Sequence, residues 1–164
     1  MGTGVLLAGA MRGEANGMNL KSCLSAMDQS NAAAAKIFVE SGAKSMTDVS
    51  GFGFLGHLWE MVRGCQFGVR LNISAIPIFE GVIELIAGGI TSSLQESNES
   101  VLQEFAVDSQ VDATKLKALV DPQTSGGLLA SVPENLAPDC LRKLLGAGYA
   151  ASIVGNVIDS AETV

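Results

Sequence analysis

The chain has 164 residues, of which 48% are hydrophobic and 16% are charged. This balance is typical of a globular protein with one full hydrophobic core, and it excludes a disordered chain. The net charge of −7 argues against a nucleic-acid partner, because a phosphate-binding face needs an excess of Lys and Arg. An anionic ligand would therefore have to be held through a metal ion or through backbone amides.

The apolar stretches are too short to predict a membrane-spanning helix, and the run GVIELIAGGI at 81–90 contains Glu84. The opening residues lack the basic region of a secretory leader, so we expect no membrane association and a cytoplasmic location. The three cysteines, Cys23, Cys65 and Cys140, lie far apart without a C-x-x-C pair. We expect reduced and mainly structural thiols, and neither a zinc site nor a disulfide framework.

The first half of the chain predicts helices that alternate with strands. The apolar run GTGVLLAGA at 2–10 is typical of a β-strand. Helical spacing follows at 19–30 and again at 30–42, where Ser30 is a candidate N-cap, Ala residues favour helix and Gly42 is a stop. AKSMTDV then predicts a strand, and FGFLGHLWEMVRG predicts a helix with one apolar face that ends at Gly64.

The second half continues this alternation. GVRLNIS at 68–74 has the period of a strand, and IFEGVIELIAGG at 78–89 has that of a helix. TSSLQESNESVLQEF is polar and predicts a surface connection with one short helix. A helix is expected at 112–121, a strand in SGGLLASV, a helix in ENLAPDCLRKLLGAG and a strand in AASIVGNV. The pattern predicts an α/β (α+β) fold, a single domain over 1–164 with one mixed β-sheet covered by helices.

The segment MTDVSGFGF, residues 46–54, places a carboxylate at the end of the predicted strand, before a glycine turn and a helix. Such an arrangement suits a metal–phosphate complex, because Gly51 and Gly53 allow positive φ and a helix start offers free N–H groups. A carboxylate at Asp48 could bind Mg²⁺ that bridges polyphosphate oxygens. Equally, Asp48 could be an N-cap or Asx-turn residue with no ligand at all.

A second glycine-bearing cluster, VDPQTSGGLLASV, occupies residues 120–132. Pro122 fixes a turn, and hydroxyl groups precede two glycines and a strand, so the segment is either a structural turn or the lining of an anion pocket. His57 is the only histidine, and its place on an apolar helix favours a packed, hydrogen-bonded side chain over a catalyst. Phe52 and Trp59 likewise favour core positions over a ligand platform.

Taken together, TDVSGFGFLGHLWEM, DPQTSGGLL, GTGVLLAGAMRG and SNAAAAKIFVESGA resemble the selenophosphate synthetases, also called selenide, water dikinases. The resemblance extends from the first residues through AASIVGNV and covers the C-terminal domain of that family, within the aminoimidazole ribonucleotide synthetase-like superfamily. Ser50 stands where Thr is common in the family, and it keeps the hydroxyl.

The resemblance implies that ATP, selenide and water yield selenophosphate, AMP and phosphate, with Mg²⁺ and ATP as cofactors. It assigns a metal-ligand role to Asp48 in the motif T-D-V-S/T-G-F-G. Site-forming, cofactor-binding positions then follow at Thr47, Ser50, Gly51, Gly53, Thr124, Ser125, Gly126 and Gly127.

The family's N-terminal ATP-binding domain, with its Gly-rich loop and reactive Cys or selenocysteine, has no counterpart in this sequence. We therefore expect a piece of a longer enzyme or a shortened gene, no catalytic residue in this chain, and no activity from the chain alone. Its partner would be that N-terminal domain, in an enzyme that is typically a homodimer. Two alternatives stay open: a stand-alone binding or regulatory module of the same fold, or a superfamily enzyme with another substrate.

Overall fold

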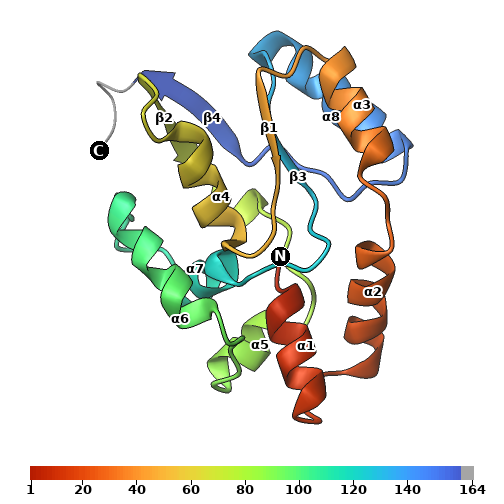
Figure 1. Cartoon of the computed structure of the whole chain (residues 1–164), viewed down its shortest axis with the longest axis vertical. Coiled ribbons are helices and arrows are strands. Elements are labelled where there is room, and N and C mark those ends of the chain that lie inside the picture. The colour runs from red at the N-terminus through yellow and green to blue at the C-terminus, as the bar shows by residue number, and fades with distance from the viewer. Residues whose placement is uncertain (160–164) are drawn as a thin grey trace. The chain divides into compact units, whose positions relative to one another are not determined.

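The computed structural model describes residues 1–159, and the chain divides into two compact units. Unit 1 comprises Met1–Gln29, Val49–Glu60 and Ile78–Gly126, and unit 2 comprises Ser30–Asp48, Met61–Pro77 and the described residues from Gly127 onward. Each unit is therefore assembled from three separate stretches of sequence. The predicted α/β (α+β) class is confirmed, because both helices and strands are present (Figure 1).

Unit 1 is helical. Its elements are α1 (Thr3–Met11), α2 (Gly17–Met27), α5 (Val82–Ala87), α6 (Gln95–Asn98), a 3₁₀ turn over Glu99–Glu104, α7 (Ala113–Val120) and most of α4 (Gly53–Val62). α1 contacts α2 and α5, and α5 contacts α7, so these four helices enclose one core. That core consists of Val5, Leu6, Cys23, Val82, Ile86, Ile90 and Ala118.

Unit 2 contains the strands. Its elements are α3 (Ala32–Glu40), β1 (Ser45–Asp48), β2 (Phe67–Leu71), 3₁₀ turns over Ile73–Ala75 and Glu134–Leu136, β3 (Leu128–Ser131), α8 (Ala137–Gly146) and β4 (Gly155–Asp159). α3 lies beside α8, as Figure 1 shows, and the two helices bury Ala34, Cys140 and Leu144. Ser30 was expected to be the N-cap of α3, but the N-cap is Asn31, without a side-chain capping hydrogen bond; Ser30 lies one residue earlier, and its Oγ accepts a hydrogen bond from the N–H of Ala32 at 3.2 Å.

The four strands pair differently from the single mixed sheet that we expected. Within the described residues, β1 pairs with β3 and β2 pairs with β4, and both pairs are antiparallel. In the first pair Asp48 lies opposite Leu128, and Thr47 lies opposite Leu129. The two glycine-bearing segments of the sequence are thus joined in unit 2 through the ends of their strands.

The opening run GTGVLLAGA is wrong as a strand, because residues 3–11 form helix α1. Val5 and Leu6 are completely buried, and the helix is apolar on all sides, so the sequence shows no helical period. The free N–H groups of Gly4 and Val5 donate to Oδ2 of Asp121, at 2.9 and 3.2 Å. Asp121, which is distant in the sequence, therefore supplies the capping side chain that Gly2, at the N-cap position of α1, does not have.

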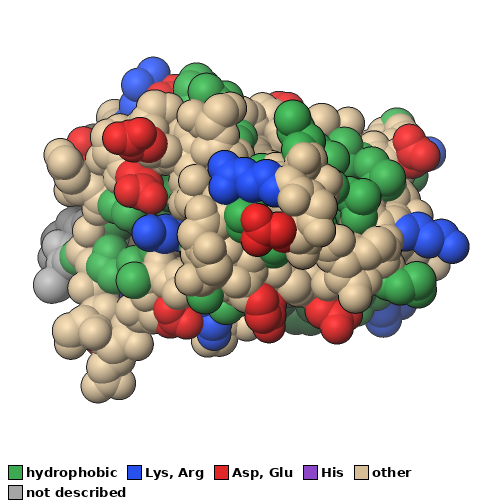
Figure 2. Space-filling model, turned by 90° about the horizontal axis from the view of Figure 1, so that it is seen from below, with side chains coloured by type: hydrophobic (Ala, Val, Ile, Leu, Met, Phe, Trp, Pro, Cys, Tyr) green, Lys and Arg blue, Asp and Glu red, His purple; other side chains and the backbone are tan. Residues whose placement is uncertain are grey.

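Within residues 1–159, we find no helix long and apolar enough to cross a membrane. On the face shown in Figure 2, acidic and basic side chains are interspersed with hydrophobic ones. The polar connection at 91–105, which was expected at the surface, is partly buried, since Gln95 is only 1% exposed.

Candidate functional site

Asp48 occupies the last position of β1, and its side chain is exposed. No described residue forms a hydrogen bond or ion pair with its carboxylate, so the N-cap and Asx-turn interpretations of Asp48 are wrong. Thr47 is half-buried, and its hydroxyl donates to the carbonyl of Asp48 at 3.0 Å. The carboxylate of Asp48 consequently keeps all its lone pairs available for a ligand.

The turn after β1 belongs to unit 1 and is closed by a hydrogen bond from the N–H of Gly53 to the carbonyl of Ser50, at 3.0 Å. Gly53 has φ of 70°, as its position in the turn predicts, whereas Gly51 does not adopt positive φ. A Cβ atom on Gly53 would lie 2.7 Å from the carbonyl carbon and oxygen of Val120. Only glycine fits here, both by conformation and by space.

Asn98 holds the same turn from a second direction. Its Nδ2 donates to the carbonyl of Gly51 at 2.9 Å and to the carbonyl of Val120 at 3.0 Å. One amide group therefore ties the glycine turn to the end of α7. Sequence reasoning missed Asn98, because it lies in a polar stretch that has no motif and no periodicity.

Two polar side chains of DPQTSGG face helix α1 of unit 1. Gln123 Oε1 accepts from the N–H groups of Gly2 and Thr3 at 3.0 and 3.2 Å, and Asp121 Oδ2 caps the next two N–H groups. Gln123 Nε2 in turn donates to Asp121 Oδ2 at 3.1 Å. The sequence did not single out either side chain, because an acid and an amide on either side of a proline form no recognisable motif. Their role in the structure is to cap the N-terminus of α1.

Burial dominates the electrostatics of Asp121. The residue is 0% exposed, and loss of solvation raises the pKa of its carboxyl group to about 6. The hydrogen bonds from the N–H groups of Val5 and Gly4 oppose this rise, because they stabilise the ionised form. Asp121 is therefore a buried acid that titrates within the range of ordinary buffers.

The second half of DPQTSGG is the part that reaches solvent. Thr124 and Ser125 are exposed, and Ser125 is the one described non-glycine residue with positive φ, at 48°. Gly126 packs against the carbonyl oxygen of Val49 so closely that a Cβ atom would collide with it. Gly127 has open space around it, so the two glycines serve different purposes.

The structure thus joins the two glycine-bearing segments within unit 1. The N–H of Gln123 donates to the carbonyl of Ser50 at 2.9 Å, and the N–H of Thr124 donates to Oγ1 of Thr3 at 2.9 Å. Among the candidates from the sequence, Ser50, Gly51, Gly53 and Thr124–Gly126 belong to this unit, while Thr47, Asp48 and Gly127 belong to unit 2.

The aromatic residues of this region are less buried than expected. Phe52 is 61% exposed, which contradicts a core position, and its ring lies 5.5 Å from that of His57. Trp59 is half-buried and meets Phe105 edge to face. Phe52, Trp59 and Asn98 line a groove of about 300 Å³, whose other lining residues are Gly56, Glu60, Ser97, Ser100 and Val101.

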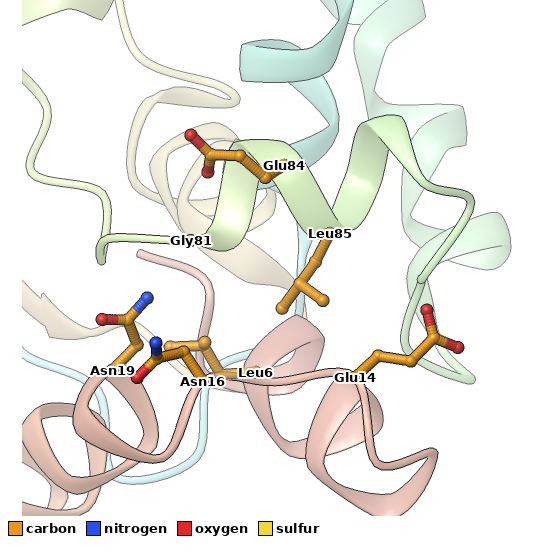
Figure 3. Close-up of a pocket in the computed structure, with 7 residues that line it drawn as sticks. All are labelled: Leu6, Glu14, Asn16, Asn19, Gly81, Glu84 and Leu85. Atoms are coloured by element: carbon orange, nitrogen blue, oxygen red, sulfur yellow. The ribbon is translucent and has the colours of Figure 1, made fainter.

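Another pocket of about 300 Å³ lies between α1, the start of α2 and α5 (Figure 3). Asn16 and Asn19 line one side, and the carboxylates of Glu14 and Glu84 lie well apart from each other. None of the candidate residues from the sequence contributes to it. We therefore place no ligand in this pocket.

The fit of a divalent metal can be judged from the donor groups. Residues 1–159 contain no cluster of three His, Cys, Asp or Glu side chains that could hold a metal ion. Among the candidate site residues from the sequence, Asp48 is the one that carries a carboxylate, and this group is exposed and of the kind that Mg²⁺ prefers. The chain can supply one metal ligand, and a complete site would need further ligands from outside the described residues.

Comparisons with known proteins extend this description. The chain is 32% identical over 164 residues to the selenide, water dikinase of Clostridioides difficile, covering 99% of this chain and 47% of that protein. It is 36% identical over 165 residues to selenide, water dikinase 2 of Peptoclostridium acidaminophilum, with the same coverage of 99% and 47%. For the selenide, water dikinase of Carboxydothermus hydrogenoformans, the identity is 33% and the coverage is 96% and 46%.

The chain spans about half the length of the curated relatives it matches. A family model described as AIR synthase related protein, C-terminal domain, matches residues 2–164, which is nearly every residue. Since that match covers far more than half of the chain, this protein belongs to the family of AIR synthase related proteins, C-terminal domain.

Proposed function

We propose that the chain is the C-terminal domain of a selenophosphate synthetase, a selenide, water dikinase. The observation that carries the proposal is its similarity, over nearly its whole length, to proteins of that name. The activity of the complete enzyme would convert ATP, selenide and water to selenophosphate, AMP and phosphate. Under this proposal, residues 1–164 act as one functional domain beside an N-terminal ATP-binding domain, and the complete enzyme is a cytoplasmic homodimer.

Asp48 would be the contribution of this chain to Mg²⁺ binding on the ATP phosphates. Its exposed carboxylate has no partner among the described residues, which supports this role. A single carboxylate cannot build a site for two metals and a polyphosphate, so the remaining ligands would come from the N-terminal domain. The isolated chain should therefore be inactive and should bind Mg-ATP weakly.

The glycine-bearing residues would form the surroundings of that ligand. Ser50 and Thr47 offer hydroxyl groups on either side of Asp48 in the sequence, and Gly51 and Gly53 shape the turn that follows. In the other segment, Thr124, Ser125, Gly126 and Gly127 would approach the phosphates. The exposure of Thr124 and Ser125 supports this assignment. Asp121 and Gln123 are not included, because their side chains already accept hydrogen bonds from the N–H groups at the start of α1.

The test is AMP formation from Mg-ATP and selenide, measured for this chain alone, for the separately expressed N-terminal domain, and for the mixture. We expect AMP only in the mixture, and we expect Asp48→Ala to abolish it. Asp28→Ala is the matched control, since Asp28 is also an exposed acid. AMP from this chain alone would show that the catalytic groups are misassigned, and no AMP from an intact mixture would favour a binding module.

A further inference from the structure

His57 and Ser50 form a hydrogen-bonded pair in unit 1. The Nε2 atom of His57 lies 3.2 Å from Oγ of Ser50, seven residues earlier in the chain. His57 is half-buried on α4, and the ring of Phe52 lies against it at 5.5 Å with an interplanar angle of 46°. The imidazole is thus held in place by the helix and by an aromatic neighbour.

The backbone of Ser50 is fixed independently of this pair. Its carbonyl accepts one hydrogen bond from the N–H of Gly53 at 3.0 Å and another from the N–H of Gln123 at 2.9 Å. The remaining freedom of Ser50 is rotation of its hydroxyl-bearing side chain. Because His57 is the hydrogen-bond partner of that hydroxyl, it selects the rotamer.

The pair does not have the composition of a nucleophilic triad. Within residues 1–159, no carboxylate is hydrogen-bonded to His57, so nothing orients the ring as a general base. A hydroxyl group held by one hydrogen bond still has unused capacity for another partner, because Ser carries one donor and two acceptor sites. Orientation of Ser50, not its activation as a nucleophile, is what this geometry provides.

We propose that His57 is a positioning residue that fixes the hydroxyl of Ser50 in the orientation in which Ser50 binds the Mg-ATP complex. The inference rests on the proposed function, since it assigns the ligand class of Ser50 from the role of Asp48. If the ring nitrogen accepts the hydroxyl hydrogen, the lone pairs of Oγ remain available for a cation or its bound water. If the ring donates, the hydroxyl hydrogen remains available for a phosphate oxygen.

The pairing can be tested on this chain without any activity assay. His57 is the only histidine, so a long-range ¹H–¹⁵N spectrum contains the ring nitrogens of one imidazole. We expect Ser50→Ala to shift the Nε2 resonance and Ser50→Thr to leave it near its original position. Phe52→Leu is the control, because it removes the neighbouring ring and keeps the hydroxyl. An Nε2 resonance that does not respond to Ser50→Ala would overturn the proposal.

The positioning role is tested by kinetics of the complete enzyme. His57→Gln can place an amide nitrogen close to the position of Nε2, whereas His57→Asn is too short to reach Ser50. We expect His57→Asn to lower kcat/KM for Mg-ATP roughly tenfold, and His57→Gln to restore most of it. The double variant Ser50→Ala/His57→Asn should lose no more than Ser50→Ala alone, because His57 acts only through the hydroxyl group that Ser50→Ala already removes.

Two results separate failure of this inference from failure of the proposed function. Equal activities of His57→Gln and His57→Asn, or additive losses in the double variant, would show that His57 does not act through Ser50. Absence of AMP formation by the unaltered complete enzyme would instead refute the proposed function. In that case the ring-nitrogen spectrum still decides whether His57 fixes Ser50.

Discussion

The carboxylate of Asp121 caps helix α1 at Gly4, with 2.9 Å between Oδ2 and the backbone nitrogen, although 117 residues separate the two in the sequence. Gly4 allows this approach, since a Cβ atom there would lie 2.6 Å from Oδ1. The cap places an acid in the interior of unit 1. The stability of this unit should therefore depend on pH, and Asp121 is one of the groups that cause this dependence.

The first prediction concerns Asp121→Asn. Burial raises the pKa of Asp121 from 3.8 to about 6 in the folded chain, so folding favours the protonated form. The contribution of Asp121 to the free energy of unfolding is fully present below pH 3.8 and is lost as the pH rises through 6. The shift corresponds to about 3 kcal/mol. The stability of Asp121→Asn relative to the unaltered chain should rise by that amount between about pH 4 and 7.

Urea unfolding followed by fluorescence measures this difference, because Trp59 is the only tryptophan and lies in unit 1. The exposed Asp28→Asn serves as control, and its difference from the unaltered chain should stay constant with pH. A constant difference for Asp121→Asn as well would mean that Asp121 does not titrate with a raised pKa in the folded chain.

The second prediction concerns Gly53→Ala. Positive φ and a Cβ contact of 2.7 Å with the backbone of Val120 both oppose a methyl group here. We expect a loss of about 2 to 4 kcal/mol in the free energy of unfolding. Gly51→Ala is the matched control in the same turn, since a methyl group on Gly51 would have no atom within 4 Å and the φ of Gly51 is not positive. Similar losses for both variants would contradict the close packing of Gly53.

The third prediction concerns the amide of Asn98. Asn98→Ala removes two hydrogen bonds, to the carbonyls of Gly51 and Val120, and we expect a loss of about 2 kcal/mol in urea unfolding. Asn98→Asp should cost more, because a carboxylate cannot donate and would face the oxygens of Gly51 and Val120. Asn135→Ala, an exposed position, is the control. The reverse order of the two Asn98 variants would be inconsistent with its role as a double donor.

The fourth prediction separates ligand binding from folding at Asp48. An N-cap residue replaced by Ala costs about 1 kcal/mol, but the side chain of Asp48 has no partner to lose among the described residues. Asp48→Ala should therefore change the free energy of unfolding by less than about 0.5 kcal/mol. Ser30→Ala, which removes a hydrogen bond to the N–H of Ala32, should be less stable than Asp48→Ala in the same assay.

The fifth prediction concerns thiol reactivity. Cys65 is exposed, whereas Cys23 and Cys140 are buried, and burial raises the pKa of the Cys23 thiol. The thiolate is the reactive species, so one thiol per chain should react rapidly with a colorimetric disulfide reagent in the native state. Cys65→Ser should abolish that rapid phase. Rapid reaction of three thiols before urea is added would contradict the burial of the other two.

The sequence predicts the elements best where local preference and tertiary structure agree. The Ala run before Gly42 is helix α3, and the residues before Val49 are β1, as their composition indicates. Helix α1 could not be predicted in this way, because its first N–H groups are satisfied by Asp121 and Gln123 from the far side of the sequence. Local patterning carries no information about such partners.

The residues of the candidate site also divide into those that the local sequence predicts and those that depend on partners distant in the sequence. Gly53 could be predicted from its place after the strand and its need for positive φ, and the structure confirms that conformation. Asn98 could not, because a double donor to two carbonyls is defined only once the chain has folded. The pairing of Ser50 with His57 was equally hidden, although both residues stood within one short motif.

The interleaved segments of the two units have a consequence for synthesis on the ribosome. Unit 1 has all its residues once Gly126 has emerged, whereas unit 2 must wait for β4, which ends at Asp159. At about 5 to 20 residues per second, the interval between these two points is roughly 2 to 7 seconds. During that time β2 has no partner strand, so its unpaired edge is open to association with other nascent chains.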